Sequence, residues 1–498
     1  MRRFYCRAAA VCAVLLGCAV AHAEAKPNVV IILADSLGWD GVGYNGSKTS
    51  TPAIDRLISS GVRLDRFYVS PLGSPTRAGL MTGRHPVLLG LTYADLQPWD
   101  NVGVHPGEHF MPQSFKQSGY QTALIGSWGL GHAQQTYHPN QRGIDDFWGQ
   151  LLLGSALNSP YHNLGGVDAQ YNGESIDTGG AYMPRWIGER ASELIRKRDQ
   201  RRPLFLLLSF PSSRHGNTSS AEALADCPPT TRPCAAYTAS IEAMDSAVDQ
   251  VMQTLAAQHM IDNTIILFMS DSGRAVGTGD GLAQGELRGG RGQTLEGGIH
   301  VPAGLGWPAE LEPNRRFGSI VTMMDVFPTL AAAAGIGTGN ERKLDGINLW
   351  PAISQDRKIQ RDEPVVLMSE AEQYGHFDLT AFDDEWKLVQ KIQVDLVYIN
   401  VQDSLYRNNE GVDEQNDLAS RYPREVERLG DAIKNIRQQQ PINGLRNNMI
   451  PPAGWRGPRN WSQYPISLAL LQDVTAAGSP PPYTRRPLDY QLGEKGRL

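Results

Sequence analysis

Cysteine is scarce in this chain. Its 498 residues include 5 cysteines, and Cys6, Cys12 and Cys18 all fall near the N-terminus. The other two, Cys227 and Cys234, enclose a short proline-containing loop. An oxidising compartment would join this pair as a disulfide, which is the interpretation we favour. A metal-binding pair is the alternative, although no second Cys or His pair stands nearby.

An excess of positive charge is also missing, and so are long apolar runs beyond the N-terminus. Lysine and arginine number 46 against 52 aspartates and glutamates, which excludes the basic footprint of a nucleic-acid-binding protein. No uninterrupted run of about eighteen apolar residues follows the N-terminal segment, so we expect no transmembrane span in the mature chain. The hydrophobic fraction of 41% is enough for a packed core and argues against wholesale disorder.

The N-terminal segment has the pattern of an export signal. Three arginines are followed by an apolar stretch from Ala8 to Ala21 and by a small-x-small cleavage site at Ala21–Ala23. We therefore predict that residues 1–23 are a signal peptide and that the mature protein is secreted or periplasmic. Two alternatives stay open, an N-terminal membrane anchor and a lipid anchor at Cys18, because Leu15–Cys18 is similar to a lipoprotein box.

Strand and helix patterns alternate from Pro27 onward. This alternation predicts an α/β fold with a large, mostly parallel sheet sandwiched by helices. Short apolar runs indicate strands at Val29–Leu33, Thr122–Ile125, Leu204–Phe210 and Thr264–Met269, and apolar periodicity indicates helices from Thr51 to Gly61 and at Met183–Lys197, Ala235–Ala256 and Val321–Ala334.

The pattern changes after about residue 375. Glu385–Ile392 and Val394–Asn400 are typical of antiparallel strands, and Pro423–Gln438 is typical of a polar-faced helix. We therefore predict a signal peptide, a main α/β domain, a smaller C-terminal α+β lobe and a Pro-rich irregular tail, at residues 1–23, 24–375, 376–440 and 441–498.

Acidic residues follow two of the predicted strands. Asp35-Ser36 comes after Val29–Leu33, and Asp271-Ser272 comes after Thr264–Met269. In an open α/β sheet the carboxyl ends of parallel strands form the ligand-binding edge, where carboxylate oxygens could share Ca²⁺ or Mg²⁺. Ordinary helix caps and turns are the alternative explanation for Asp and Ser at such positions.

The segment Ser70–Pro86 carries a more specific signal. Pro75 suits the first turn of a helix, and Arg77 would then stand near the helix N-terminus. Free backbone amides together with a guanidinium form a good cradle for sulfate or another oxyanion. We expect Ser74, just before Pro75, to cap this helix.

This segment resembles the signature of the sulfatases, which is Cys or Ser, any residue, Pro, Ser or Thr, then Arg, followed by a stretch ending in Thr-Gly-Arg. The resemblance extends over roughly residues 27–420 and is to the arylsulfatase B-like branch of the family. It implies an alkaline-phosphatase-like fold. It also implies a Cys converted to formylglycine, Ca²⁺ held by three Asp and one Asn, and Arg, Lys and His side chains around the sulfate. Other matching segments are Leu33–Tyr44, Gly126–Gly131, Gly143–Gly149, Phe268–Gly273 and Leu287–Pro302.

The chain departs from this pattern where the chemistry occurs. Gly73 stands at the nucleophile position, so formylglycine cannot form there. Asp35, Arg77 and Asp271 are retained, and Arg291 keeps the charge of a family Lys. The substituted positions are Ser36 and Ser272 among the metal ligands, Ser127 for a Lys, and Gly129 and Arg214 for the two His. We expect Ca²⁺ binding to be weak or absent, since Ca²⁺ affinity follows the number and charge of its ligands.

Three hypotheses follow. The first is a pseudo-sulfatase that binds a sulfated or anionic small molecule or glycan without hydrolysing it. The second is a sulfuric- or phosphoric-ester hydrolase with a displaced nucleophile, Ser74 or Thr76, and with His132 or His215 as the acid. The third is a partner-binding protein whose Pro-rich tail forms the contact surface.

Overall fold

The computed structural model describes most of the chain after the expected signal peptide. The described residues are 26–92, 94–155, 157–162, 165–211, 232–275, 287–339, 342–371, 376–394, 398–408, 414–441, 451–452 and 454–464. Of the residues named above, Cys6, Cys12, Cys18, Arg214, His215 and Cys227 lie outside the described residues, as does the side chain of Cys234.

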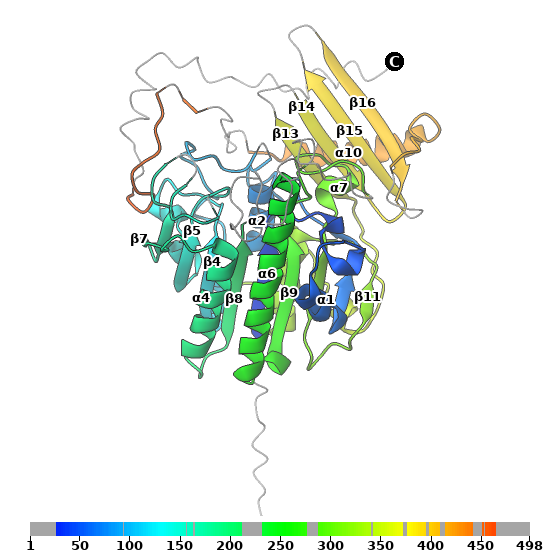
Figure 1. The fold of residues 1–498 in the computed structure, drawn as a ribbon. Helices are drawn as coiled ribbons and strands as arrows, with labels where there is room; N and C mark the ends of the chain where they lie inside the picture. The colour runs from blue at the N-terminus through cyan, green and yellow to red at the C-terminus, as the bar shows by residue number, and fades with distance from the viewer. Residues whose placement is uncertain are drawn as a thin grey trace, which may run out of the picture.

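A ten-stranded sheet forms the centre of the main domain (Figure 1). The strands in spatial order are β11 (Arg315–Phe317), β2 (Val62–Leu64), β10 (Ala303–Gly306), β9 (Thr264–Ser270), β1 (Asn28–Ala34), β8 (Leu204–Phe210), β4 (Gln121–Ser127), β5 (Asp146–Gln150), β6 (Ala169–Tyr171) and β7 (Glu174–Ser175). The central strands β9, β1, β8, β4 and β5 run parallel, so their carboxyl ends share one edge of the sheet. This arrangement confirms the predicted fold class.

Side chains of the central strands alternate between two cores, as the two-residue period of a strand requires. In β1, Val29, Ile31 and Leu33 face one core while Val30 and Ile32 face the other. The first core is covered by α2 (Gly73–Thr82), α3 (Met111–Gln117) and α8 (Val326–Ala333). The second core is covered by α1 (Pro52–Ser59), α4 (Met183–Lys197) and α6 (Arg232–Ala257), and Figure 1 shows α4 and α6 lying across the front of the sheet.

A smaller antiparallel sheet forms the C-terminal lobe. Its strands are β13 (Val365–Ala371), β14 (His376–Phe382), β15 (Trp386–Val394) and β16 (Ile399–Arg407), and α10 (Pro423–Gln438) packs on it. This sheet begins before the predicted domain boundary at residue 375, because β13 pairs with β14. The predicted strand Val394–Asn400 is wrong: Val394 is the last residue of β15, and the next strand starts at Ile399.

Shorter elements complete the fold. They are a two-stranded sheet of β3 (Phe67–Tyr68) and β12 (Val321–Thr322), the helices α7 (Glu296–Ile299) and α9 (Trp350–Ser354), and the 3-10 turns Trp39–Gly41, Gly43–Asn45, Gln135–Tyr137, Pro139–Arg142, Ile261–Asn263 and Met323–Asp325. A buried ion pair joins the two lobes, since the Lys387 ammonium of β15 lies 2.6 Å from Glu296 at the start of α7; the same ammonium lies 2.9 Å from Glu414 of its own lobe.

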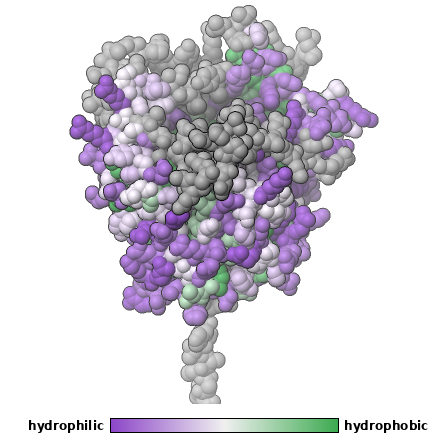
Figure 2. All heavy atoms as spheres, in the orientation of Figure 1, coloured by the Kyte–Doolittle hydropathy of each residue, from purple (hydrophilic) through white to green (hydrophobic). Residues whose placement is uncertain are grey.

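The described part of the Pro-rich tail has no helix or strand, but it packs against the main domain. Trp461 is fully buried, and its backbone amide donates to the Val167 carbonyl. In the lower half of the face in Figure 2, where the described residues form the surface, hydrophilic residues dominate and hydrophobic residues lie in small separate areas. In the part of the chain that the structure describes, no helix has the length and apolar character to cross a membrane.

Candidate functional site

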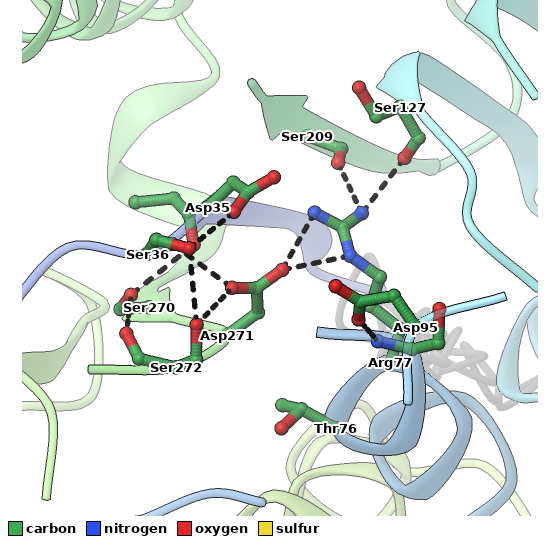
Figure 3. A network of polar contacts seen from close by, with 12 residues as sticks. Asp35, Ser36, Thr76, Arg77, Asp95, Ser127, Ser209, Ser270, Asp271 and Ser272 are labelled. Atoms are coloured by element: carbon green, nitrogen blue, oxygen red, sulfur yellow. Dashed lines mark hydrogen bonds and ion pairs between the residues drawn. The ribbon is translucent and has the colours of Figure 1, made fainter. Parts of the chain in front are cut away.

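The retained and substituted positions of the sulfatase pattern meet at one edge of the sheet. Asp35 follows β1, Ser127 ends β4, Ser209 lies near the end of β8, and Asp271 follows β9. Because these strands are parallel, the four residues converge at their carboxyl ends, where the N-terminal half of α2 brings Arg77 (Figure 3). The sequence pattern had predicted Asp35, Arg77 and Asp271 at this edge.

Arg77 is the central cation of the site. Its side chain is 2% exposed, and its Nε and one terminal nitrogen lie 3.0 and 2.9 Å from Oδ2 of Asp271, which is fully buried. The other terminal nitrogen donates to the Ser127 carbonyl at 2.9 Å and to the Ser209 hydroxyl at 2.6 Å. The guanidinium is therefore held by groups of this chain (Figure 3), and its contacts with Asp271 Oδ2, the Ser127 carbonyl and the Ser209 hydroxyl fix its orientation.

The four residues at the family's metal-ligand positions bond to one another. The Ser36 hydroxyl donates to Asp35 Oδ1 at 2.7 Å, and the Ser272 hydroxyl donates to Asp271 Oδ1 at 3.2 Å. The two hydroxyl oxygens are 3.3 Å apart, and the Ser36 amide donates to Asp271 Oδ1 at 3.1 Å. Ser36 reaches this position with a left-handed backbone, at a φ of 57°. The sequence pattern thus predicted which residues share the site, and only the structure shows how they pair.

These groups do not fit Ca²⁺. The ion takes roughly six to eight oxygen ligands, several of them carboxylates. Within the described residues no group of three or more His, Cys, Asp or Glu side chains is arranged to hold a metal ion. Of the two carboxylates at this position, Asp271 already bonds to the Arg77 guanidinium. The Arg77 guanidinium thus neutralises part of the carboxylate charge at this position.

Gly73, at the nucleophile position, is the first residue of α2 and faces the centre of the site. A Cβ atom on Gly73 would lie 2.9 Å from Asp271 Oδ2, 3.2 Å from Leu153 Cδ1 and 3.3 Å from Asp95 Oδ1. The backbone thus places position 73 where a nucleophilic side chain would face the centre of the site, beside Asp271. The space beside it is taken by an apolar methyl group and two carboxylates.

Leu153 fills the neighbouring space as well. A Cβ atom on Gly129, which stands at a family His position, would lie 2.6 Å from Leu153 Cγ and 2.7 Å from Leu153 Cδ2. Gly129 also has a φ of +74°, which strains any other residue. Leu153 is 9% exposed, so a buried apolar side chain stands beside both Gly73 and Gly129.

Asp95 is a further charged residue of the site, and sequence analysis missed it. Its Oδ1 accepts a hydrogen bond of 2.8 Å from the Ser74 amide in the first turn of α2, and its Oδ2 forms an ion pair with Arg291. The Asp95 side chain is 10% exposed. No local motif marks Asp95 or Leu153, because their partners are distant in sequence. Arg291, for example, is 196 positions away from Asp95.

The proposed displaced nucleophiles are engaged in structural contacts. The Ser74 hydroxyl is fully buried and accepts a hydrogen bond of 3.0 Å from the Leu96 amide, while the Thr76 hydroxyl donates to the Ser70 carbonyl at 3.1 Å. The prediction that Ser74 caps the helix is wrong. The helix begins earlier, at Gly73, because the Leu72 carbonyl already accepts from the Thr76 amide.

His132 does not belong to this network. Its Nε2 contacts the Pro98 carbonyl at 3.1 Å, and its ring packs edge-on against Trp461 at 5.4 Å between ring centres. Burial lowers the pKa of His132 to about 4, so this imidazole is neutral at physiological pH. Its partners are a backbone carbonyl and an indole, which is typical of a structural histidine.

A mostly parallel sheet with this arginine-bearing helix at the carboxyl ends of its strands defines a protein of the alkaline-phosphatase-like fold class. The Sulfatase family model matches residues 27–336, which is more than half of the chain. The chain belongs to the sulfatase family.

Proteins similar to this chain agree with the assignment to the sulfatase family. N-acetylgalactosamine-6-sulfatase of Homo sapiens is 28% identical over 366 residues, which are 69% of this chain and 69% of that protein. Steryl-sulfatase of Mus musculus is 30% identical, over 68% of this chain and 67% of the relative. The solved structure of Ps i-CgsB in complex with k-i-k-neocarrahexaose superposes with a TM-score of 0.76 at 27% identity, covering 85% of this chain and 95% of that one.

Proposed function

We propose that this protein is a pseudo-sulfatase: it keeps the sulfatase fold and does not hydrolyse sulfate esters by the family's mechanism. The observation that carries the proposal is Gly73, which has no side chain to be converted or to attack, at the nucleophile position beside Asp271. Loss of a covalent nucleophile alone costs on the order of 10⁶-fold in rate. Loss of a general acid or base typically costs about a further 10²–10⁴-fold, although such penalties do not simply add.

The surroundings of Gly73 support the proposal. Leu153 stands where functional side chains at positions 73 and 129 would extend, so a single substitution at either glycine meets a buried apolar group. A hydroxyl or thiol at position 73 would also meet the carboxylates of Asp271 and Asp95. Negative charge beside a nucleophile opposes the approach of an anionic sulfate ester.

We further propose that no Ca²⁺ is bound at the substituted ligand positions. The support is the hydrogen bonding of Ser36 and Ser272 to the two retained aspartates, together with the ion pair between Arg77 and Asp271. The Arg77 guanidinium neutralises part of the negative charge of Asp271, which weakens the attraction of this carboxylate for a divalent cation.

The ligand class that we propose is a sulfated or otherwise anionic glycan or small molecule. Two relatives point to sulfated sugars: one is named N-acetylgalactosamine-6-sulfatase, and Ps i-CgsB was solved with a neocarrahexaose. The signal-like segment at residues 1–23 would deliver the protein to the periplasm or the exterior, where such glycans occur.

The test is hydrolysis of 4-nitrophenyl sulfate and 4-nitrophenyl phosphate by the purified mature protein, with and without Ca²⁺. We expect no turnover above the buffer blank. Arg77→Ala serves as the site variant, and Arg316→Ala, at an exposed ion pair with Asp65, is the matched control. Turnover that is lost in Arg77→Ala and kept in Arg316→Ala would refute the proposal, and Ser74→Ala would then show whether that hydroxyl is the nucleophile.

A further inference from the structure

Asp95 occupies the place that an anionic ligand would take. Its carboxylate accepts a hydrogen bond from the Ser74 amide, in the first turn of the ten-residue helix α2, and forms an ion pair with the Arg291 guanidinium. Asp95 Oδ1 would lie 3.3 Å from a Cβ atom on Gly73. A helix N-terminal amide together with a guanidinium is the donor set that binds sulfate, phosphate and carboxylate. The group bound there is a carboxylate of the chain itself.

We propose that Asp95 is an intramolecular ligand that closes a tetrahedral-oxyanion site. In this state Asp95 neutralises the Arg291 charge, and sulfate or phosphate groups bind only when Asp95 is neutralised or displaced. The proposal rests on the proposed function in that the site retains anion-binding groups without the groups for hydrolysis.

Burial strengthens the ion pair between the Asp95 carboxylate and Arg291. Asp95 is 10% exposed and Arg291 is 16% exposed, so water screens their ion pair far less than a surface pair. Arg291 Nε makes no hydrogen bond within the described residues, which leaves a guanidinium donor for a ligand with more oxygens than a carboxylate. A sulfate has four oxygens and could use donors that Asp95 leaves unused.

The charges of the described site residues agree with an internally closed site. Arg77 and Arg291 supply the positive charge, and Asp35, Asp95 and Asp271 supply the negative charge. Both arginines are paired with a carboxylate. An incoming dianion would therefore meet like charge at short distance, and this repulsion falls when the Asp95 charge is removed.

The position of Asp95 in the chain suits a displaceable ligand. Asp95 lies in the connection from α2 to α3, outside any helix or strand. Its carboxylate contacts the Ser74 amide and the Arg291 guanidinium. Ser74, in contrast, is fixed in the first turn of α2. An exchange of Asp95 for an external oxyanion leaves the donors on the helix in place.

The experiment measures binding of inorganic sulfate and, separately, inorganic phosphate to the mature protein by isothermal titration calorimetry. Asp95→Asn keeps an acceptor for the Ser74 amide and removes the charge, and Asp95→Ala removes both. Asp100→Asn is the matched control, because Asp100 is a buried carboxylate of the same connection that accepts from the Gln97 amide at 2.7 Å. Thermal melts of each variant confirm that it is folded.

We expect Asp95→Asn and Asp95→Ala to bind sulfate at least about tenfold more tightly than the wild type, and Asp100→Asn to match the wild type. The gain should disappear in Asp95→Ala/Arg291→Ala. Equal affinity in the wild type and both Asp95 variants would overturn the proposal, as would a gain that survives Arg291→Ala. A gain for phosphate without one for sulfate keeps the oxyanion site and changes only its preferred ligand.

These outcomes are independent of the hydrolysis assay. Turnover of 4-nitrophenyl sulfate by the wild type would overturn the pseudo-sulfatase proposal whatever the sulfate affinities are. Unchanged sulfate affinity in the Asp95 variants would overturn the closed-site proposal even if no protein in the series shows turnover.

Discussion

Replacement of Arg77 by Met tests whether this residue stabilises the fold through the buried charge of Asp271. Arg77 is 2% exposed and Asp271 is fully buried, so Arg77→Met leaves a carboxylate in the interior without its guanidinium. Breaking a buried pair by removing one partner costs about 3–5 kcal/mol. For a chain larger than 250 residues, this free energy corresponds to a fall in Tm of about 3–10 °C.

The double variant Arg77→Met/Asp271→Asn separates charge from packing. Asn keeps an oxygen that can accept from the Ser36 amide, as Asp271 Oδ1 does now, and it carries no charge. Because replacing both partners of a buried pair with neutral groups is far less costly than removing one, the double variant should be at least about 2 kcal/mol more stable than Arg77→Met.

The assay is urea unfolding followed by far-UV circular dichroism, with Tm measured in parallel. Arg316→Met is the control: it removes an exposed partner of Asp65 and should change the stability by less than about 1 kcal/mol. If the double variant were as unstable as Arg77→Met, the cost would come from lost packing and not from the unpaired carboxylate. The electrostatic reasoning would then be wrong.

Two further predictions concern the metal and the pH. Addition of EDTA or of millimolar CaCl₂ should leave the Tm of the wild type unchanged, since the carboxylates at the metal-ligand positions are engaged with Ser36, Ser272 and Arg77; a Ca²⁺-dependent rise in Tm would contradict this. Burial raises the pKa of Asp168 to about 6, so the folded state holds this proton more tightly than the unfolded state. Stability from this group is present below the unfolded pKa of about 4 and decreases as the pH rises to about 6, by roughly 3 kcal/mol in total. Urea unfolding at several pH values should therefore show a smaller decrease across this window in Asp168→Asn, and an identical decrease in the two proteins would refute the assignment.

Apolar periodicity and local motifs predicted much of the fold. The buried parallel strands are continuous apolar runs, so β8 (Leu204–Phe210) could be read directly, and the helices Met183–Lys197 and Pro423–Gln438 were predicted with the bounds that the structure has. The strand predicted at Val394–Asn400 was placed too early, since β16 spans Ile399–Arg407. The ends of β15 and β16 depend on their pairing with each other, which leaves little mark on the local sequence.

The sequence by itself predicted which functional groups of the sulfatase pattern are missing from this protein. Gly73, Gly129, Ser36 and Ser272 are identities of residues, and a missing side chain needs no coordinates to be recognised. Which groups replace them was decided only by the tertiary structure. Leu153 comes from a distant part of the chain and Asp95 from the connection after α2, and tertiary packing brings both beside Gly73. Spacing along a sequence records local geometry, whereas the charge balance of a buried site depends on every segment that the fold brings to it.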